Sequence, residues 1–84
     1  MASVYVLVSQ KTGKKYVGST SRTPEERLKE HNAGIVPWTN GHRPLKLIYS
    51  ENIRNMDLAV KREKYFKTGK GRKVLESLLI DQYR

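Results

Sequence analysis

Two side chains suited to phosphate and proton chemistry, Arg27 and His31, lie four positions apart in the stretch "RLKEH". Residues at this spacing share one face of an α-helix, about one turn from each other. The rigid fork of donors on an arginine matches two phosphate oxygens, and a histidine can relay a proton near neutral pH. An ordinary interpretation also fits: Arg27 pairs with Glu30 or Glu26, and His31 lies on the surface near a helix C-terminus. The spacing alone leaves both interpretations open.

Two tyrosines, Tyr5 and Tyr16, lie in neighbouring segments that are typical of strands, and Gly13 between them suits a tight hairpin turn. An even loop places both phenols on one face of the hairpin, whereas a three-residue loop separates them. In the even register Tyr16 lies opposite Ser9, and Tyr5 lies roughly 13 Å further along its strand. A bulge or leaning side chains would then bring the hydroxyls together. Taken alone, both tyrosines are more typical of strand packing.

The elements that must position these side chains begin with strands over residues 3–9 and 14–18. A helix follows, and its start is marked by a capping box of Thr23 and Glu26. Gly34 is placed to end this helix. Arg27 and His31 therefore belong to a well-delimited helix that directly follows a hairpin.

The second half of the chain adds one strand and two helices. Residues 35 to 45 are expected to form a loop with an Asn-Gly turn, after which "LKLIYSE" is typical of a strand. Asn55 caps a second helix that Gly69 ends, and a last helix spans about residues 71 to 82. The predicted fold is α+β: a small three-stranded antiparallel sheet flanked by three helices, in the order β-β-α-β-α-α.

Composition limits the function classes. A length of 84 residues is enough for one compact domain, residues 1–84, with a single core. The formal charge of +9 attracts polyanions, of which nucleic acid is the commonest, although simple solubility is an alternative. The absence of cysteine excludes a disulfide framework and a Cys-based zinc site. Without a signal-like start or ~20 consecutive apolar residues, we expect a soluble cytoplasmic protein with no membrane partner.

The ordered set of these residues resembles the GIY-YIG endonuclease superfamily, in particular its small stand-alone members. Ser3-Val4-Tyr5 stands in the place of the first tripeptide and Tyr16-Val17-Gly18 in the place of the second. The segments "RLKEH", "HRPLKLIYSE" and "AVKREKYFKTGKGRK" extend the resemblance over nearly the whole chain. The last of them is similar to the helix that carries the family's metal-binding glutamate, here Glu63.

The chain departs from the family pattern at three points. Its first tripeptide keeps only the tyrosine, and the asparagine that many larger members carry after the glutamate is missing from "KVLES". That second departure loosens the implied positioning of the substrate rather than the core chemistry. Ser19 and Thr20 stand where some members carry a lysine. A lysine general base is therefore not expected.

The resemblance implies a metal-dependent endonuclease with an active site of Tyr5, Tyr16, Arg27, His31 and Glu63. Glu63 would hold Mg²⁺ or Mn²⁺, because one carboxylate suffices when waters and a substrate phosphate complete the octahedron. Its ordinary alternative is an ion pair with Lys67 at i, i+4. Arg27 would stabilise the phosphoryl charge. Tyr5 would accept the proton of the attacking water, directly or with Tyr16 orienting that water, and the imidazole would relay a proton.

Further residues are expected to contact DNA. These are Lys67, Lys70, Arg72 and Lys73 on the backbone, Arg43 and Trp38 as second-rank contacts, and Gly18 where the chain approaches the substrate. A solvated basic helix face and a strand-ending glycine are the alternatives. We expect an endonuclease that acts in DNA repair or processing, with branched or damaged DNA among its candidate substrates. The alternative is a nucleic-acid-binding module that kept the fold without useful catalysis. A lone domain is expected to select weakly among DNA substrates, or to be directed to its substrate by a partner protein or by forming a homodimer.

Overall fold

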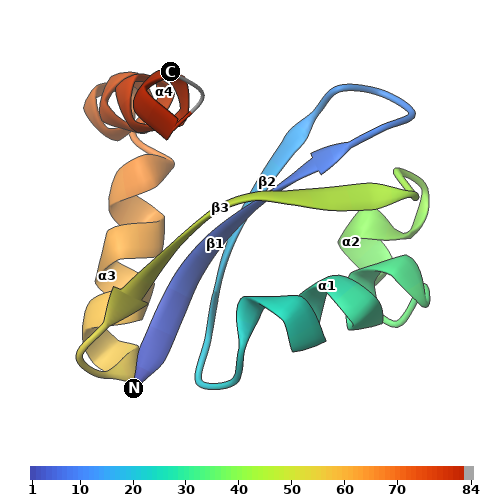
Figure 1. Ribbon diagram of the computed structural model, residues 1–84, viewed down its shortest axis with the longest axis horizontal. Coiled ribbons are helices and arrows are strands. Elements are labelled where there is room, and N and C mark those ends of the chain that lie inside the picture. The colour runs from blue at the N-terminus through green and yellow to red at the C-terminus, as the bar shows by residue number, and fades with distance from the viewer. Residues whose placement is uncertain (83–84) are drawn as a thin grey trace.

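The computed structural model describes residues 1–82, so the last two residues of the expected domain over residues 1–84 lie outside it. Its elements are β1 (Ala2–Ser9), β2 (Lys15–Thr20), α1 (Pro24–Asn32), α2 (Pro37–Asn40), β3 (Leu45–Ile53), α3 (Met56–Phe66) and α4 (Gly69–Gln82). The three strands form one antiparallel sheet in the order β2-β1-β3 (Figure 1). The predicted α+β fold is confirmed, and α2 is a short additional helix.

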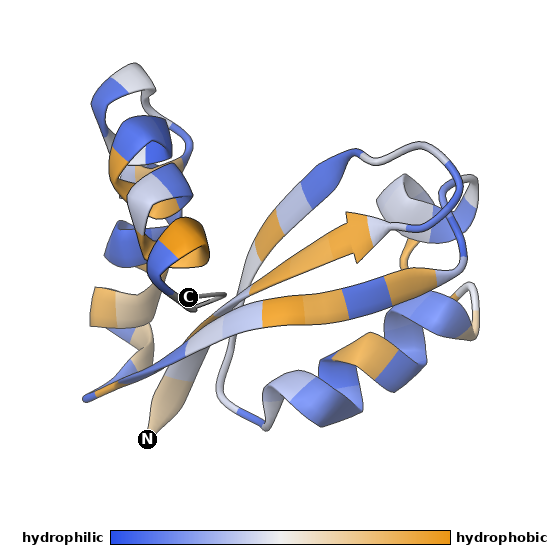
Figure 2. Ribbon diagram, turned by 45° about the horizontal axis from the view of Figure 1, so that its top comes forward, coloured by the Kyte–Doolittle hydropathy of each residue, from blue (hydrophilic) through white to orange (hydrophobic). Residues whose placement is uncertain are grey.

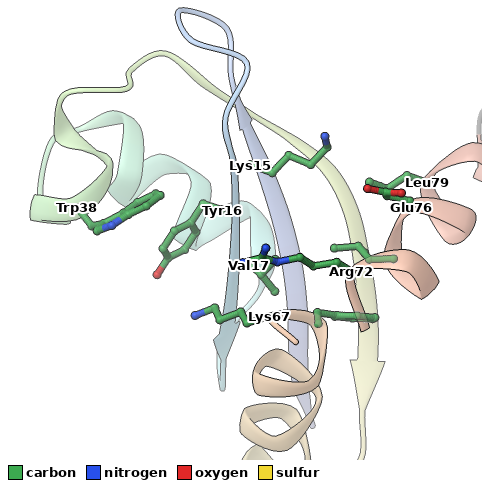
Figure 3. A pocket seen from close by; sticks show the side chains of 10 residues that line it. Lys15, Tyr16, Val17, Trp38, Lys67, Arg72, Glu76 and Leu79 are labelled. Carbon is green, nitrogen blue, oxygen red and sulfur yellow. The ribbon is translucent and has the colours of Figure 1, made fainter. Parts of the chain in front are cut away.

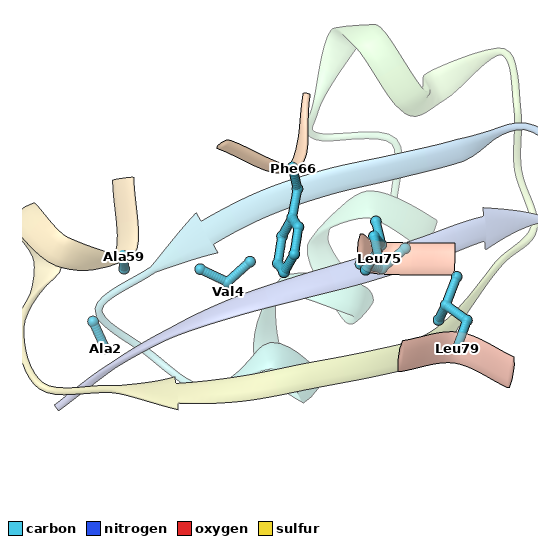
Figure 4. Close-up of a cluster of buried hydrophobic side chains, with 7 residues drawn as sticks. Ala2, Val4, Ala59, Phe66, Leu75 and Leu79 are labelled. Carbon is cyan, nitrogen blue, oxygen red and sulfur yellow. The ribbon is translucent and has the colours of Figure 1, made fainter. Parts of the chain in front are cut away.

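The sheet has a helical layer on each face. Val4 and Val6 of the central strand β1 pack on one face against α3 and α4, where Phe66 inserts between the layers (Figure 4). Tyr5 and Leu7 point to the other face, which α1 covers. Burial on both faces explains the continuous apolar run of β1, which stands out in the hydropathy colouring of Figure 2. The two tyrosines therefore lie in the α1 layer, whereas Glu63 comes from the opposite layer.

The hairpin between β1 and β2 decides how the tyrosines meet. Tyr5 pairs with Gly18, and Leu7 pairs with Tyr16. The two phenols share one face, as predicted, but the expected pairing of Tyr16 with Ser9 is wrong by two residues, because the strands stay paired closer to the turn. Tyr5 and Tyr16 are consequently diagonal neighbours, with ring centroids 6.3 Å apart. No bulge in this hairpin is needed to bring them together.

Helix α1 begins and ends as predicted. The backbone nitrogen of Glu26 donates to Oγ1 of Thr23 at 3.2 Å, and the Glu26 side chain accepts from the Thr23 nitrogen. At the other end Gly34 adopts a φ of 82° and donates to the carbonyl of His31. These caps satisfy the backbone groups at both ends of the short helix that carries the two candidate site residues.

The predicted loop over residues 35 to 45 contains α2. Pro37 occupies the first turn of this helix, where its missing N–H costs nothing, and Thr39 lies inside the helix and is fully buried. The predicted Asn-Gly turn is present at the end of α2, where the nitrogen of His42 donates to the carbonyl of Thr39 at 2.9 Å across Asn40 and Gly41. This helix brings residues of the middle segment against the α1 layer.

The junction between α3 and α4 differs from the prediction. Asn55 caps α3 as expected, accepting from the nitrogen of Leu58 at 2.9 Å. Helix α3 ends at Phe66, however, and Gly69 is the first residue of α4 rather than the stop of α3. Gly71 is the glycine that the junction requires, because a Cβ there would lie 1.8 Å from the carbonyl oxygen of Tyr65. None of the helices within residues 1–82 is long and apolar enough to cross a membrane.

Candidate active site

Tyr5 is the centre of a hydrogen-bonded group in the α1 layer. It lies in the middle of β1, and its side chain is fully buried. Its hydroxyl lies 3.1 Å from Nε2 of His31, and Nε of Arg27 donates to the hydroxyl oxygen at 3.4 Å. Tyr16 packs beside this group, with its ring centroid 4.9 Å from that of His31. The structure therefore brings four of the five predicted catalytic residues into direct contact.

Thr39 orients the imidazole of His31. Nδ1 of His31 lies 2.6 Å from Oγ1 of Thr39, and the Thr39 hydroxyl donates to the carbonyl of Val36 at 3.3 Å. Because the single hydroxyl proton is used in that second bond, Thr39 must accept from an N–H at Nδ1. Nε2 is then the unprotonated nitrogen, and it accepts a hydrogen bond from the Tyr5 hydroxyl. Burial, together with the nearby charge of Arg27, lowers the pKa of His31 and favours this neutral form.

The two phenols are held in their protonated form. Burial raises the pKa of Tyr5, and the hydrogen bond from Arg27 opposes this shift only in part. Burial also raises the pKa of Tyr16, and the negative charge of Glu63 raises it further. The ionised phenolate form of either tyrosine is therefore disfavoured at neutral pH. Tyr5 can act as a base only if its own proton leaves as another arrives, and Nε2 of His31 is positioned to take it.

Gly18 makes room for the tyrosine rings. A Cβ at this position would lie 2.5 Å from both Cζ and the hydroxyl oxygen of Tyr5, and 2.9 Å from Cε1 of Tyr16. The strand continues to Thr20, so the alternative that Gly18 ends the strand is wrong. A glycine is required here because the Tyr5 phenol approaches the backbone of β2 closely.

Glu63 reaches the site from the opposite layer, around the edge strand β2. Ser19 donates to Oε1 of Glu63 at 2.5 Å, and Nζ of Lys67 donates to Oε2 at 2.7 Å. Side chains alternate along β2, so Ser19 faces α3 while its neighbour Gly18 faces the α1 layer. The Glu63 carboxylate is close enough to raise the pKa of both Tyr5 and Tyr16. The five predicted residues thus surround one stretch of the β2 edge, and the predicted pair of Glu63 with Lys67 is also present.

The carboxylate of Glu63 has the properties of a one-carboxylate metal site. Its side chain is 21% exposed, which leaves it open to solvent beside the half-buried Tyr16. Residues 1–82 contain no group of three or more His, Cys, Asp or Glu side chains that could enclose a metal ion. Mg²⁺ needs no such cage, because it commonly keeps several waters and binds through one or two carboxylates plus substrate phosphates. The ammonium of Lys67 pairs with Oε2 of this carboxylate.

The family model described as the GIY-YIG catalytic domain matches residues 1–83, essentially the whole chain. The chain belongs to the GIY-YIG family. GIY-YIG enzymes are endonucleases that generally depend on a divalent metal, so the family implies nuclease activity on DNA. No curated protein and no solved structure matches the chain.

The basic residues around the GIY-YIG site are distributed unevenly. Lys67 and Arg72 line a groove beside Tyr16, whereas Lys70 and Lys73 are exposed on α4 outside its lining. Arg43 lies apart from the groove, and its guanidinium donates to backbone carbonyls at the ends of α1 and α2. The structure therefore gives Arg43 a structural task in holding these two helices together.

Thr39 and Ser19 hydrogen-bond to residues of the candidate site, and the sequence did not predict these contacts. Thr39 lies in a segment expected to be a loop, and eight residues of separation from His31 form no recognisable pattern. In the sequence, Ser19 stands out only because it occupies a position where some family members carry a lysine. The alternation of a strand that begins at Lys15 would have placed Ser19 on the face opposite Tyr16. Only the packing of α3 against β2 identifies its partner as Glu63.

Proposed function

We propose that this GIY-YIG chain, as a single domain, is a divalent-metal-dependent endonuclease that hydrolyses DNA phosphodiester bonds in DNA repair or processing. The observation that carries the proposal is the position of the Tyr5 hydroxyl between Nε of Arg27 and Nε2 of His31, at 3.4 and 3.1 Å. One phenol thereby touches both a phosphate-binding cation and a neutral proton acceptor. A tyrosine that only packs within a sheet does not need hydrogen bonds to both an arginine and a histidine.

Tyr5 and His31 together would activate the attacking water. Because Tyr5 is fully buried in the unbound chain, the attacking water would have to enter with the substrate. The Tyr5 oxygen then accepts a proton from this water, and the phenol proton passes at the same time to Nε2 of His31. This transfer suits the raised pKa of Tyr5, because no free phenolate has to form before the reaction. Tyr16 packs against both rings and orients the water from the open side of the site. The phosphorus–oxygen bond to the departing nucleotide breaks as the water oxygen bonds to phosphorus.

Arg27 would stabilise the charge on the phosphoryl oxygens. Its Nη1 is 2.7 Å from Oε1 of Glu30, and its Nε contacts Tyr5, so the guanidinium is held in one orientation before the substrate arrives. The hydrogen bond to Tyr5, and that to Glu30, raise the pKa of Arg27. A fixed cation costs no reorganisation when charge develops during the reaction.

Glu63 would hold Mg²⁺ or Mn²⁺, with Ser19 keeping the carboxylate oriented through Oε1. When bound, the ion supplies Lewis-acid stabilisation of the phosphoryl and departing oxygens. The ammonium of Lys67 would then leave the Glu63 carboxylate and pair with a DNA phosphate. The DNA backbone would contact Lys70, Arg72 and Lys73 of α4 further along the strand. Gly18 and Arg43 would make weaker DNA contacts.

The alternative is a nucleic-acid-binding module without useful catalysis, and the satisfied Glu63–Lys67 ion pair is the observation that favours it. The test is nicking of supercoiled plasmid and branched DNA by purified wild type and Glu63→Ala, with Mg²⁺, with Mn²⁺ and with EDTA. The proposal predicts metal-dependent nicking that Glu63→Ala loses. Equal residual cutting by both proteins would assign the activity to a contaminant and favour the binding module. We also predict that the protein is cytoplasmic, and that a partner protein or a homodimer targets it to its substrate.

A further inference from the structure

A groove of about 630 Å³ opens beside the proposed catalytic residues, between β2, α2 and α4. Figure 3 shows Trp38 and Tyr16 on one side of it and Glu76 and Leu79 on the other. Its floor is apolar where Val17 lies. The volume falls within the ~300–1,000 Å³ typical of small-ligand pockets. Because Tyr16 belongs to both places, any occupant of the groove lies directly next to the site of cleavage.

The wall of the groove continues a row of neighbouring, mutually tilted rings that begins at the proposed catalytic histidine. Ring centroids are 4.9 Å apart for His31 and Tyr16, 5.2 Å for Tyr16 and Trp38, and 5.5 Å for Trp38 and His42. Trp38, the one tryptophan of the chain, is 58% exposed, whereas the other aromatic rings described by the structure are buried or half-buried. A large exposed indole supported from behind by other rings is the arrangement that stacks well on a flat ligand.

The charge of the groove suits a phosphate. Three cationic side chains, Lys15, Lys67 and Arg72, line it against one carboxylate, Glu76. Lys67 pairs with Glu63, but none of the ion pairs among residues 1–82 involves Lys15 or Arg72. Two cations therefore lie beside an aromatic wall and an apolar floor without an acidic partner in the described part of the chain. A nucleotide, with one flat base and one phosphate, matches both features.

We propose that this groove receives an unpaired nucleotide of the DNA substrate, with its base stacked on Trp38 and its phosphate held by Lys15 and Arg72. The inference rests on the proposed nuclease function and specifies its substrate class: DNA with unpaired nucleotides at the cleavage point, such as flaps, bulges and single-stranded ends. Bases within a duplex have both faces covered by their neighbours, so only an unstacked base can lie on the indole. Blunt duplex DNA would contact the cations alone.

The single tryptophan makes the stacking directly measurable. Wild-type protein is titrated in EDTA with a short oligothymidylate, with an abasic oligomer of the same length and charge, and with a blunt duplex, while Trp38 emission is recorded. We expect the oligothymidylate to quench the emission and to bind about 10-fold more tightly than the abasic oligomer. Equal affinities for the two oligomers with unchanged emission would overturn the inference.

Variants identify the residue responsible. Trp38→Ala should lower the affinity for labelled oligothymidylate about 10-fold, to that of the abasic oligomer, while Trp38→Phe should keep most of it. Ile80→Ala is the matched control, because Ile80 is 59% exposed on α4 and does not line the groove. Circular dichroism verifies that each variant is folded. Unchanged base-dependent affinity in folded Trp38→Ala would contradict the stacking.

Failure of this inference is distinguishable from failure of the proposed function. Binding is measured without divalent metal, so base-dependent quenching in a protein that never cuts DNA would support the groove and overturn only the nuclease. Conversely, equal metal-dependent cleavage rates on blunt and flapped DNA would support the nuclease function and overturn the substrate class proposed for the groove.

Discussion

Thr39 accepts a hydrogen bond from Nδ1 of His31 at 2.6 Å, and this contact decides which face of the imidazole can take a proton. The other ring nitrogen, Nε2, is thereby left as the acceptor 3.1 Å from the Tyr5 hydroxyl. Thr39 and His31 are both fully buried, so water does not compete for either bond. In the proposed mechanism, this buried threonine of α2 thus prepares Tyr5 to act as a base.

Replacing Thr39 by valine tests this arrangement with little change of shape. Without the Oγ1 acceptor, the proton on the imidazole can move to Nε2, where it blocks transfer from Tyr5. We expect kcat for DNA cleavage to fall about 10-fold while KM stays close to the wild-type value, because the substrate contacts remain. Thr39→Ser restores the oxygen and should recover most of the rate. A Thr39→Ser variant as slow as folded Thr39→Val would mean that Thr39 acts through packing.

The neutral His31 also predicts how stability depends on pH. Burial lowers its pKa in the folded protein, whereas the unfolded chain takes up a proton below about pH 6.5. The unfolded state therefore binds more protons in this range, and the free energy of unfolding falls as the pH drops below that value. Urea unfolding at about pH 7.5 and 5.5 should show a larger loss for wild type than for His31→Gln. Equal losses in the two proteins would contradict a buried neutral His31.

The parts of this fold that depend on local chemistry were predictable from the sequence. The capping box of Thr23 and the side-chain cap of Asn55 each involve residues within three positions, and both are confirmed. For an even loop, residue parity also predicted Tyr5 and Tyr16 on one face, and the observed register confirms this alternative. Their separation was not predictable, because a shift of two residues preserves the face and changes only the distance.

Features that depend on packing between distant elements were missed. Gly71 was not predicted to matter, because its constraint is the carbonyl of Tyr65 in the preceding helix. Helix α2 is too short to carry a periodic pattern, so Thr39 could not be connected to His31. Ser19 likewise found its partner only through the contact between β2 and α3. The side chains that meet in the candidate site could be named from the sequence, whereas the residues that orient them could not.

Gly18→Ala should damage both stability and catalysis. The added Cβ would meet the Tyr5 ring at 2.5 Å, and this ring is buried and cannot simply swing away. We expect a loss of about 1–3 kcal/mol in the free energy of unfolding, and slower cleavage because the phenol moves relative to His31. Gly41→Ala is the matched control, since no atom lies within 4 Å of its added Cβ. Thermal unfolding of the two variants measures the difference, and equal melting temperatures would contradict this packing.

Arg27 should affect the reaction more than binding. Arg27→Lys keeps a positive charge but loses the planar fork that bonds Tyr5 and Glu30 simultaneously. We expect single-turnover cleavage to fall about 100-fold while the Kd for DNA, measured by anisotropy, changes less than about 3-fold. A parallel loss of affinity and rate would instead assign Arg27 to ordinary backbone binding.

The most direct measurement is the single-turnover rate of DNA cleavage with saturating protein and Mg²⁺, for wild type, Glu63→Gln and Glu25→Gln. Both variants remove one negative charge, but Glu25 is exposed in the first turn of α1 and has no task in the site. A nuclease that holds its metal through Glu63 predicts a rate about 100-fold lower in Glu63→Gln and unchanged in Glu25→Gln. Wild-type cleavage by folded Glu63→Gln would contradict it.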